Sequence, residues 1–361
     1  MELLSVTMND GVKPRSEIEG KDNSSEDKSN YKIVRKGDMV YNSMRMWQGA
    51  NGISPCDGIV SPAYTVLMPK QEINNGYFAA LFKSANLINE FRKNSQGMTS
   101  DTWNLKYPQI ETIKVQIPSV SEQDKVSELF GVVDARIVAQ TQLIEALKKY
   151  KRGLLRTVFS EKGSHSLLHD AVSHRIDEVC DVLSGKRIPK GETFSPRPTE
   201  YRYITVSDMG EKYVSSDTLQ FITSHTEKQI TRYKVRNGDI IISVAGTLGK
   251  LNIITPDLDG VNLTENCDRF TNFRGINPEY LYHVLSSDLI QSQIEASKTK
   301  NGQPKLALER IRNFVVPVPH QIRQEQFVGV MNSIDKYIAS QQAVLDRCCK
   351  ARAGLQQQLF I

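Results

Sequence analysis

The sequence predicts an α+β fold with two similar units in tandem, each followed by a long helix, the two helices pairing as an antiparallel coiled coil. Three observations predict this fold class: an internal repeat, a heptad pattern that ends each copy, and mixed strand-like and helix-like runs before it. The chain has 361 residues, of which 39% are hydrophobic, so two domains can each bury a core.

The internal repeat has an offset of 201 residues. The stretch "VRKGDMVYN" (34–42) recurs as "VRNGDIIIS" (235–243), and both copies read as a turn that leads into an apolar strand. A second match aligns residues 118–160 with residues 319–361 without a gap. Its identical positions are Pro118, Gln123, Asp134, Ile137, Gln140, Lys149, Gly153, Leu154 and Phe159. Because both matches share one offset, chance is a poor explanation for them.

Both copies of this second match carry a helix signal. Their seam residues recur at steps of four and three, the heptad pattern of a coiled coil, over about five heptads. Ser119 is followed by Glu122, a capping-box pattern that marks the start of the first helix. The alternative is an ordinary amphipathic helix that packs on its own domain.

Polar residues interrupt the two seams at matching positions, Gln140 with Gln341 and Lys151 with Arg352. A polar seam residue costs stability but can fix the register of a coiled coil. Because both glutamines lie near the middle of their helices, an antiparallel pair about a pseudo-twofold axis brings them together. The predicted helix-pair interface consists of Val133, Ile137, Gln140, Ile144, Ile334, Ile338, Gln341 and Leu345.

The predicted boundaries place a first domain at 1–117, a helix at 118–160, a linker at 161–173, a second domain at 174–317 and a helix at 318–361. Helix-like runs at 76–93 and 278–297 occupy similar places in the two copies. The second copy has a leading segment (175–203) for which the first copy shows no counterpart. We expect the first domain to lack this opening segment, to receive it from another chain, or to have lost it through a misplaced start codon.

Composition excludes some classes of protein. No run of about 18 apolar residues is present, and the first ten residues lack the pattern of a secretory signal. The five cysteines have no framework spacing, so we expect reduced thiols in a cytoplasm. The net charge of +5 and the sequence pI of about 8.8 are compatible with nucleic-acid binding.

Catalytic and metal-binding patterns find little support. "AGTLGKL" (245–251) has too short a glycine spacing for a phosphate loop, and Leu251 stands where Ser or Thr is required. His165 and His169 could share a helix face, but no further metal ligand is evident. Gly-x-Ser-x-Gly, Cys-x-x-Cys and the Asn-Pro-Pro-aromatic tetrad of amino-methyltransferases are absent. The sequence therefore predicts a protein that is not an enzyme and holds no metal.

Basic, polar and aromatic residues gather instead in glycine-containing loops. Cationic side chains neutralise phosphates, and Arg or Gln can read base edges in the major groove. Each loop alone is more simply a solvated loop, but together they favour DNA. The candidate DNA-binding residues are Lys13, Arg15, Arg45, Trp47, Gln48, Lys186, Arg187, Lys190, Thr247, Lys250, Lys298, Lys300, Gln303 and Lys305. "KKYKRGLLR" (148–156) lies at a helix end, where a structural role or a partner contact is equally suitable.

The repeat, the Pro-then-helix junction, "LKKYKRGLLRTVFS" (147–160) and "YRYITVSDMGEKYVSS" (201–216) make the chain similar to the specificity subunits of type I restriction–modification systems. The resemblance covers nearly the whole length. It implies two target-recognition domains that each read one half of a bipartite DNA site, and helices that act as spacer and as docking surface. The chain departs from the family pattern at its N-terminus.

The resemblance also implies the partners. They are double-stranded DNA, two methyltransferase subunits that bind S-adenosylmethionine, and restriction–translocase subunits, in a prokaryotic cytoplasm; this chain itself is expected to bind no cofactor. A helix over 122–159 would span about 57 Å, enough to set half-sites roughly one DNA turn apart. The alternatives are a coiled-coil scaffold without a DNA role, a split specificity subunit completed by another chain, and a nuclease acting alone.

Overall fold

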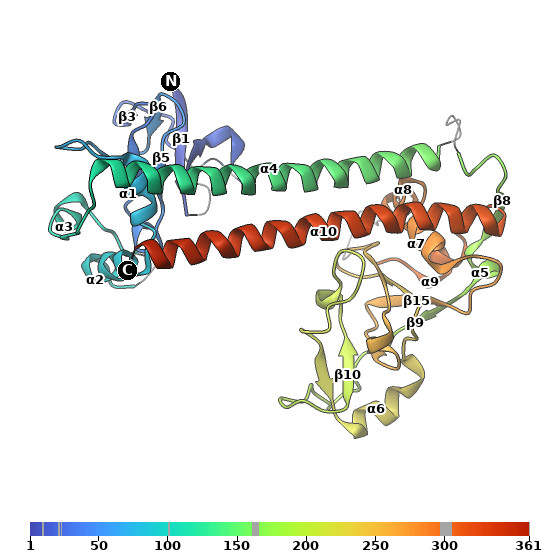
Figure 1. Ribbon diagram of the computed structural model, residues 1–361. Coiled ribbons are helices and arrows are strands. Elements are labelled where there is room, and N and C mark those ends of the chain that lie inside the picture. The colour runs from blue at the N-terminus through green and yellow to red at the C-terminus, as the bar shows by residue number, and fades with distance from the viewer. Residues whose placement is uncertain are drawn as a thin grey trace. The chain divides into compact units, whose positions relative to one another are not determined.

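The computed structural model describes residues 1–8, 11–20, 22, 24–99, 102–160, 166–296 and 305–360. The chain divides into two compact units (Figure 1). Unit 1 consists of Met1–Ile144 and Ser340–Ile361, and unit 2 consists of Glu145–Ala339. The predicted boundaries follow the starts of the long helices, whereas the compact units divide both helices and each take part of both. Among the described residues, no helix has the length and apolar character needed to cross a membrane.

Unit 1 contains a four-stranded sheet in the order β2-β1-β6-β3 and a three-stranded sheet in the order β5-β4-β7. In the first sheet β1 runs parallel to β6, and in the second β4 runs antiparallel to both neighbours. The strands are β1 (Glu2–Thr7), β2 (Gly11–Pro14), β3 (Lys32–Val34), β4 (Met39–Asn42), β5 (Asn51–Ile53), β6 (Gly58–Val60) and β7 (Tyr64–Leu67). The helices before the long one are α1 (Asn75–Leu81), α2 (Ala85–Asn94) and α3 (Tyr107–Ile110).

Unit 2 repeats this plan with additional strands. Its sheets have the orders β11-β10-β14, β13-β12-β15-β9 and β16-β8. The strands are β8 (Val172–Arg175), β9 (Asp181–Ser184), β10 (Tyr201–Ile204), β11 (Gln220–Ile222), β12 (Ile240–Ser243), β13 (Leu251–Ile253), β14 (Asn262–Leu263), β15 (Cys267–Thr271) and β16 (Val315–Val318). The helices are α5 (Ile176–Val179), α6 (Ser224–Ile230), α7 (Pro278–Ser286), α8 (Asp288–Ala296) and α9 (Leu308–Arg312).

The two long helices, of which each unit takes a part, are α4 (Val120–Val158) and α10 (Gln321–Leu359).

The two units differ in the strands that flank their sheets. In unit 2, β9 pairs with β15 and β8 pairs with β16. In the described part of unit 1, no strand pairs with the corresponding side of β7, and residues 114–117 form no strand. Val115 and Val316 occupy matching positions in the two copies. Val316, which lies in the paired strand β16, is completely buried, whereas Val115, which lies in no strand, is 38% exposed.

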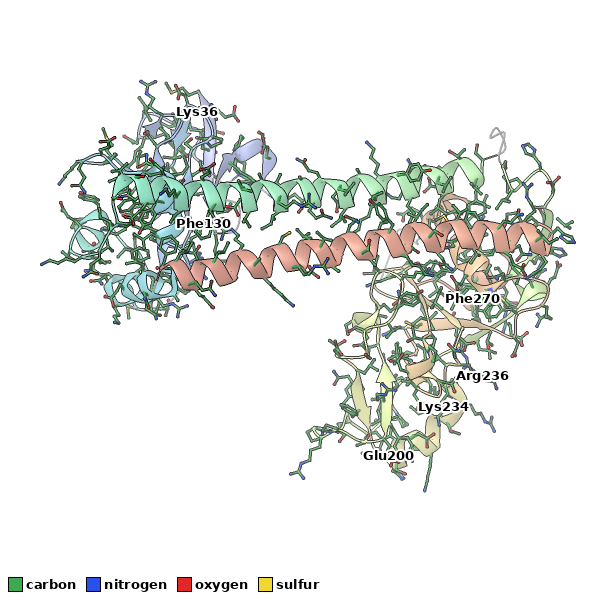
Figure 2. The ribbon with its side chains drawn as sticks, in the orientation of Figure 1. Lys36, Phe130, Glu200, Lys234, Arg236 and Phe270 are labelled. Atoms are coloured by element: carbon green, nitrogen blue, oxygen red, sulfur yellow. The ribbon has the colours of Figure 1, made fainter. Side chains whose placement is uncertain are left out.

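The repeated Gly-Asp turns have the same hydrogen bonds in both units. Asp38 Oδ2 accepts from the backbone N–H of Arg35 at 2.8 Å, and Asp239 Oδ2 accepts from Arg236 at 2.8 Å. The glycines have φ values of 92° and 81°, a region that favours glycine because it lacks a Cβ. Figure 2 labels Lys36 beside the turn of unit 1 and Arg236 in that of unit 2. Each turn delivers the chain into a central strand, β4 or β12.

Each helix-like run before a long helix is two helices, where the sequence predicted one. Residues 76–93 break between α1 and α2, and residues 278–297 break between α7 and α8. The physical reason is local capping. Ser84 Oγ accepts from the N–H of Leu87 at 3.4 Å in extended backbone, so it starts a new helix, and Ser287 takes a similarly extended conformation.

A repeated glutamine fixes the start of each long helix. In unit 1, Gln123 Oε1 accepts from the backbone N–H of Asn74, the N-cap of α1, at 2.9 Å, and its Nε2 donates to Pro118 O at 3.0 Å. In unit 2, Gln324 makes equivalent bonds to Asn277 at 2.7 Å and Pro319 at 2.9 Å. Both glutamines are almost completely buried. This glutamine latch, Gln123 or Gln324 with its two backbone partners, explains why the glutamine and the proline before each long helix are identical in the two copies.

Repeated aromatic residues close the two cores. Phe360, after the end of α10, contacts Tyr77 of α1 with ring centroids 5.4 Å apart and stacks on Phe130 of α4 at 5.9 Å. In unit 2, Phe159 after the end of α4 contacts Tyr280 of α7 at 6.1 Å. Each core is therefore completed by the end of the other copy's long helix. Figure 2 shows Phe130 on α4.

Gln140 and Gln341 meet within unit 1. Gln140 Nε2 donates to Gln341 Oε1 at 2.8 Å and to its backbone oxygen at 3.1 Å, and Gln140 is buried. Ile144, one helical turn along the seam, is also buried. An amide that donates two hydrogen bonds across an apolar seam favours one register, because a shift of register removes both acceptors.

The cationic seam residues pair with the aspartate that is identical in the two copies. In unit 1, Arg352 donates to Asp134 through Nε and through Nη2, the latter at 3.1 Å. In unit 2, Lys151 pairs with Asp335. In both units the two long helices run antiparallel, and these ion pairs join one helix to the other.

Candidate nucleic-acid interface

The loop that follows β9 is bonded across the ends of three strands. The backbone N–H of Gly185 donates to Cys267 O at 3.0 Å, and that of Lys186 donates to Leu263 O at 2.8 Å. Tyr203 Oη donates to Lys186 O at 2.6 Å. The backbone at Gly185 runs so close to β14 that an added Cβ would lie 2.0 Å from Thr264 O. The loop therefore holds the next residue, Arg187, on a rigid base.

Arg187 is exposed yet oriented by one partner. Its Nε donates to Glu265 Oε1 at 2.6 Å, and its side chain is 78% exposed. Burial alone would raise the pKa of Glu265, but the hydrogen bond from Arg187 and backbone bonding hold that pKa below its ordinary value. The carboxylate is therefore charged at neutral pH and acts as a support for the guanidinium.

A recess of about 390 Å³ lies beside this ion pair. Phe194 and Tyr203 meet edge to face within its lining, with centroids 5.6 Å apart. Polar groups come from the residues that follow β10 and β14. The lining includes Arg187, Phe194, Tyr203, Thr205, Glu265 and Asn266. The recess thus combines an apolar wall with convergent hydrogen-bonding groups.

The other candidates of unit 2 lie in several places. Lys186 and Lys190 are exposed on the same loop as Arg187. Lys250 is half-buried and donates to Met209 O, which ties it to the fold. Thr247 is exposed, and Lys305 forms a bridge with Ala245 beside it. Lys298, Lys300 and Gln303 lie outside the described residues.

The first two candidates of unit 1 differ in role. Arg15 Nη1 donates to Ile18 O at 2.6 Å and Nη2 to Gly20 O at 3.0 Å, so its guanidinium organises its own loop. Lys13 lies on β2 and lines a separate groove of about 670 Å³ that also contains Asp134 of α4.

The second candidate loop of unit 1 is packed rather than open. Trp47 meets Trp103 edge to face at 5.1 Å, and the Arg92 guanidinium of α2 lies 5.7 Å from its ring. Trp47 Nε1 donates to Met44 O at 3.2 Å. Arg45 and Gln48 flank it and are half-buried. The aromatic residue that the sequence marked as a DNA contact is held by packing against α2, which the pattern of the loop alone did not show.

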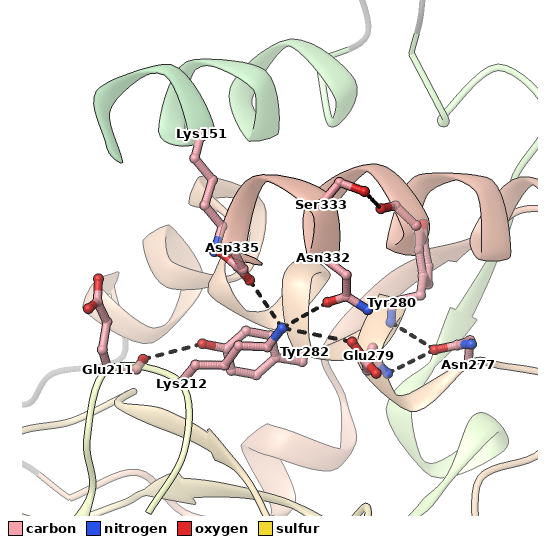
Figure 3. A network of polar contacts seen from close by, with 11 residues as sticks. Lys151, Glu211, Lys212, Asn277, Glu279, Tyr280, Tyr282, Asn332, Ser333 and Asp335 are labelled. Atoms are coloured by element: carbon pink, nitrogen blue, oxygen red, sulfur yellow. Dashed lines mark hydrogen bonds and ion pairs between the residues drawn. The ribbon is translucent and has the colours of Figure 1, made fainter. Parts of the chain in front are cut away.

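A polar network attaches the sheet region of unit 2 to its helices (Figure 3). Lys212, which lies in the chain between β10 and β11, donates to Asp335 Oδ2 and to Asn332 Oδ1 of α10, both at 3.1 Å. It also lies 3.8 Å from Glu279 Oε2 of α7. Lys151 of α4 reaches the same aspartate. The candidate loops of unit 2 are therefore carried on a framework that is fixed to α4 and α10.

The chemistry of the histidines and cysteines is limited. Among the described residues, no three His, Cys, Asp or Glu side chains gather as a metal site. His174 pairs with Glu178, and His165 lies outside the described residues. Burial raises the pKa of the Cys180 and Cys267 thiols to about 12, so neither is a reactive thiolate at neutral pH.

Sequence reasoning found Arg187 but missed the groups that make its surroundings. Glu265, Phe194 and Tyr203 come from separate segments, and no local pattern joins them. Asp335 was seen only as a repeated residue, the match of Asp134. Asp335 and Lys151 fall toward the same end of an antiparallel pair centred on Gln140 and Gln341, which was a signal that the two charges could meet.

The fold and the recess define a class of protein: a tandem pair of related α+β units, joined through long helices, that present different loops on a shared framework. The family model described as type I restriction modification DNA specificity domain matches residues 5–149 and 169–347. The chain therefore belongs to this family.

Individual relatives agree. The chain is 23% identical over 346 residues to the type I restriction enzyme MjaVIII specificity subunit of Methanocaldococcus jannaschii, covering 91% of this chain and 79% of that protein. It is 25% identical to the Escherichia coli EcoBI specificity subunit over 62% of this chain and 47% of that one. A chain from a structure of an assembled type I restriction–modification system matches with a TM-score of 0.61, 18% identity and coverage of 93% and 84%. The specificity subunit from M. genitalium matches with a TM-score of 0.55, 16% identity and coverage of 91% and 84%.

Proposed function

We propose that this chain is the non-catalytic specificity subunit that recognises a bipartite DNA site and positions two methyltransferase subunits on it. The observation that carries the proposal is the repeat. The two units share their turns, latches and seam ion pairs but differ in the loops around their recesses. A shared framework with unlike reading loops suits a DNA site with two unlike halves.

The proposal also assigns the partners. S-adenosylmethionine is bound by the methyltransferase subunits, restriction–translocase subunits join when the complex cleaves DNA, and the assembly acts in the prokaryotic cytoplasm. Restriction and methylation chemistry then belong to other chains.

The first test is salt-dependent binding to duplex DNA by the complex of this chain with its methyltransferase subunits. Each phosphate contact should contribute about −0.9 to the slope of log affinity against log salt. Methylation mapping should then find two short half-sites separated by a spacer of unspecified bases. One continuous short site would contradict the bipartite proposal, and the absence of duplex binding would favour the scaffold alternative.

The long helices are proposed to set the spacer. Inserting one heptad into α4 and one into α10 keeps the seam pattern and adds roughly 10 Å to each helix. Because base pairs stack about 3.4 Å apart, the preferred spacer should lengthen by about three base pairs. Insertion of seven residues in the Ser160–Val172 connection is a control that leaves the helices unchanged. An unaltered spacer in the heptad variant would refute the ruler role.

In the described part of unit 1, β7 has a strand partner on one side only, which favours a variant of this proposal in which a second chain adds a strand to unit 1. Hydrogen exchange at 65–67 in the isolated chain and in the assembled complex tests it. Protection that appears only in the complex would support the added strand. Equal exchange in both would exclude it.

A further inference from the structure

We infer that the recess beside Arg187 is where unit 2 reads its half-site, and that Arg187 recognises a guanine there. The inference rests on the proposed function and names the reading residue within it. It starts from the way in which the guanidinium is held.

Glu265 occupies only one edge of the guanidinium. Arg187 Nε donates to Glu265, whereas neither terminal nitrogen donates to any part of the chain that the structure describes. The two terminal N–H groups form a fork that fits the O6 and N7 acceptors of guanine. A carboxylate behind Nε fixes the direction of this fork, so little rotamer freedom is lost when it meets the base.

The loop beneath Arg187 has the rigidity that base reading needs. Its backbone is bonded to residues at the ends of β14 and β15, and Tyr203 holds Lys186 O from below. A reading group must be positioned to within about 0.5 Å, which side chains on fixed backbone achieve better than those on free loops.

Unit 1 has a matching recess in the same place of its fold. The parallel ladder pairs Leu4 with Val60 in unit 1 and Ile204 with Leu263 in unit 2. In each unit, residues around this ladder line a recess. In unit 1 this recess has a volume of about 550 Å³. Two recesses at equivalent positions indicate a shared role rather than an accident of packing.

The matched recesses have different chemistry. By ladder register, Glu265 corresponds to Pro62, so unit 1 has no carboxylate at that position, and Asp22 Oδ1 lies 3.7 Å from Arg15 Nε instead. In that recess, both terminal nitrogens of Arg15 donate hydrogen bonds to backbone carbonyls. Asp22 and Asp27 also line the recess of unit 1. Carboxylates accept hydrogen bonds from base amino groups, as on cytosine. Of these two recesses, the one in unit 2 is therefore the one whose arginine has terminal nitrogens without a hydrogen-bond acceptor in the described part of the chain.

The experiment uses the complex of the full chain with its methyltransferase subunits. Methylation mapping first defines the two half-sites, and binding is then measured on that duplex with each guanine of the second half-site replaced in turn by 7-deazaguanine, which lacks the N7 acceptor. In the native complex, one such replacement should weaken binding roughly 10-fold. The Arg187→Ala complex should bind the unmodified duplex roughly 10- to 100-fold more weakly. It should no longer respond to that replacement, and should still require the first half-site.

Two further variants separate base reading from phosphate contact. Arg187→Lys keeps the charge but lacks the fork, so it should remain insensitive to the replaced guanine. Lys190→Ala, on the same loop outside the recess, should reduce the salt slope by about one and leave base preference unchanged. The inference is overturned if the Arg187→Lys or the Arg187→Ala complex discriminates between guanine and 7-deazaguanine as strongly as the native complex does. A native complex that shows no sequence preference would instead refute the proposed function itself.

Discussion

Replacement of Asp335 by asparagine should destabilise unit 2 strongly, because the carboxylate serves two cations. Its side chain is 23% exposed, and those of Lys151 and Lys212 are 21% and 12% exposed. Removing one member of a fully buried ion pair costs about 3–5 kcal/mol, and an exposed pair contributes up to about 1 kcal/mol. With these intermediate exposures, Asp335→Asn should cost about 2–3 kcal/mol.

The repeat supplies the matched control. Asp134→Asn removes the equivalent carboxylate, but Asp134 is 48% exposed and has Arg352 as its partner. The expected cost is about 1 kcal/mol. Urea unfolding followed by hydrogen exchange should report each unit separately, since a protein with two compact units need not unfold in one step.

The pH dependence gives an independent readout. Burial raises the pKa of Asp335, but the hydrogen bond and charge of Lys151, together with Lys212, outweigh it and hold that pKa below its ordinary value. A lowered folded-state pKa contributes stability above the unfolded pKa of about 4, and this stability is lost as the pH falls through the folded value. Asp335→Asn should therefore flatten the acid part of the stability curve. Burial also lowers the pKa of His283 to about 3. The protein should therefore still lose stability below about pH 6.5, because this histidine takes up a proton only in the unfolded state.

Equal losses for the two variants, or an unchanged stability for Asp335→Asn, would refute this reasoning. Adding Lys151→Met and Lys212→Met to Asp335→Asn should recover most of the loss. The cost arises from unpaired buried cations, and the triple variant no longer contains them. If the triple variant is no more stable than the single one, packing rather than charge explains the effect.

Three further predictions concern other parts of the framework. Gln324→Ala should lower the stability of unit 2 by about 2 kcal/mol, because it leaves the backbone N–H of Asn277 without its 2.7 Å partner; a urea midpoint equal to the native one would contradict this. Gly185→Ala should destabilise the loop before Arg187, because its Cβ would lie 2.0 Å from a backbone oxygen; undiminished DNA discrimination with native stability would show that the loop adjusts. A thiol reagent should modify exposed Cys349 well before buried Cys180 in the native protein, with both reacting in urea; comparable native rates would count against the burial described.

Much of the framework could be predicted because it is local or repeated. The heptad pattern located both long helices, and the capping pair was recognised: Ser119 Oγ lies 2.8 Å from Glu122 Oε2. The shared offset predicted that Gln140 meets Gln341, since a twofold repeat brings central residues together. The family resemblance rested on the same long-range regularity, and the family match is in agreement with it.

Other features depend on contacts between distant segments. The packing of Trp47 on α2 and the break between α1 and α2 come from tertiary contacts and capping that the loop composition does not specify. The division of each long helix between two units was also outside the reach of the heptad pattern, because a seam of steps four and three looks the same wherever the domains attach.

The sequence by itself determined the repeat, the helix pair and the class of protein, because periodicity and a constant offset are properties of the chain in one dimension. The tertiary structure decided which arginine is available for reading. Arg15 and Arg187 are both basic residues in loops, yet one is bonded to its own backbone and the other is held by Glu265, 78 residues further along the chain. Only folding brings that carboxylate to the Nε edge and leaves the fork of Arg187 facing outward.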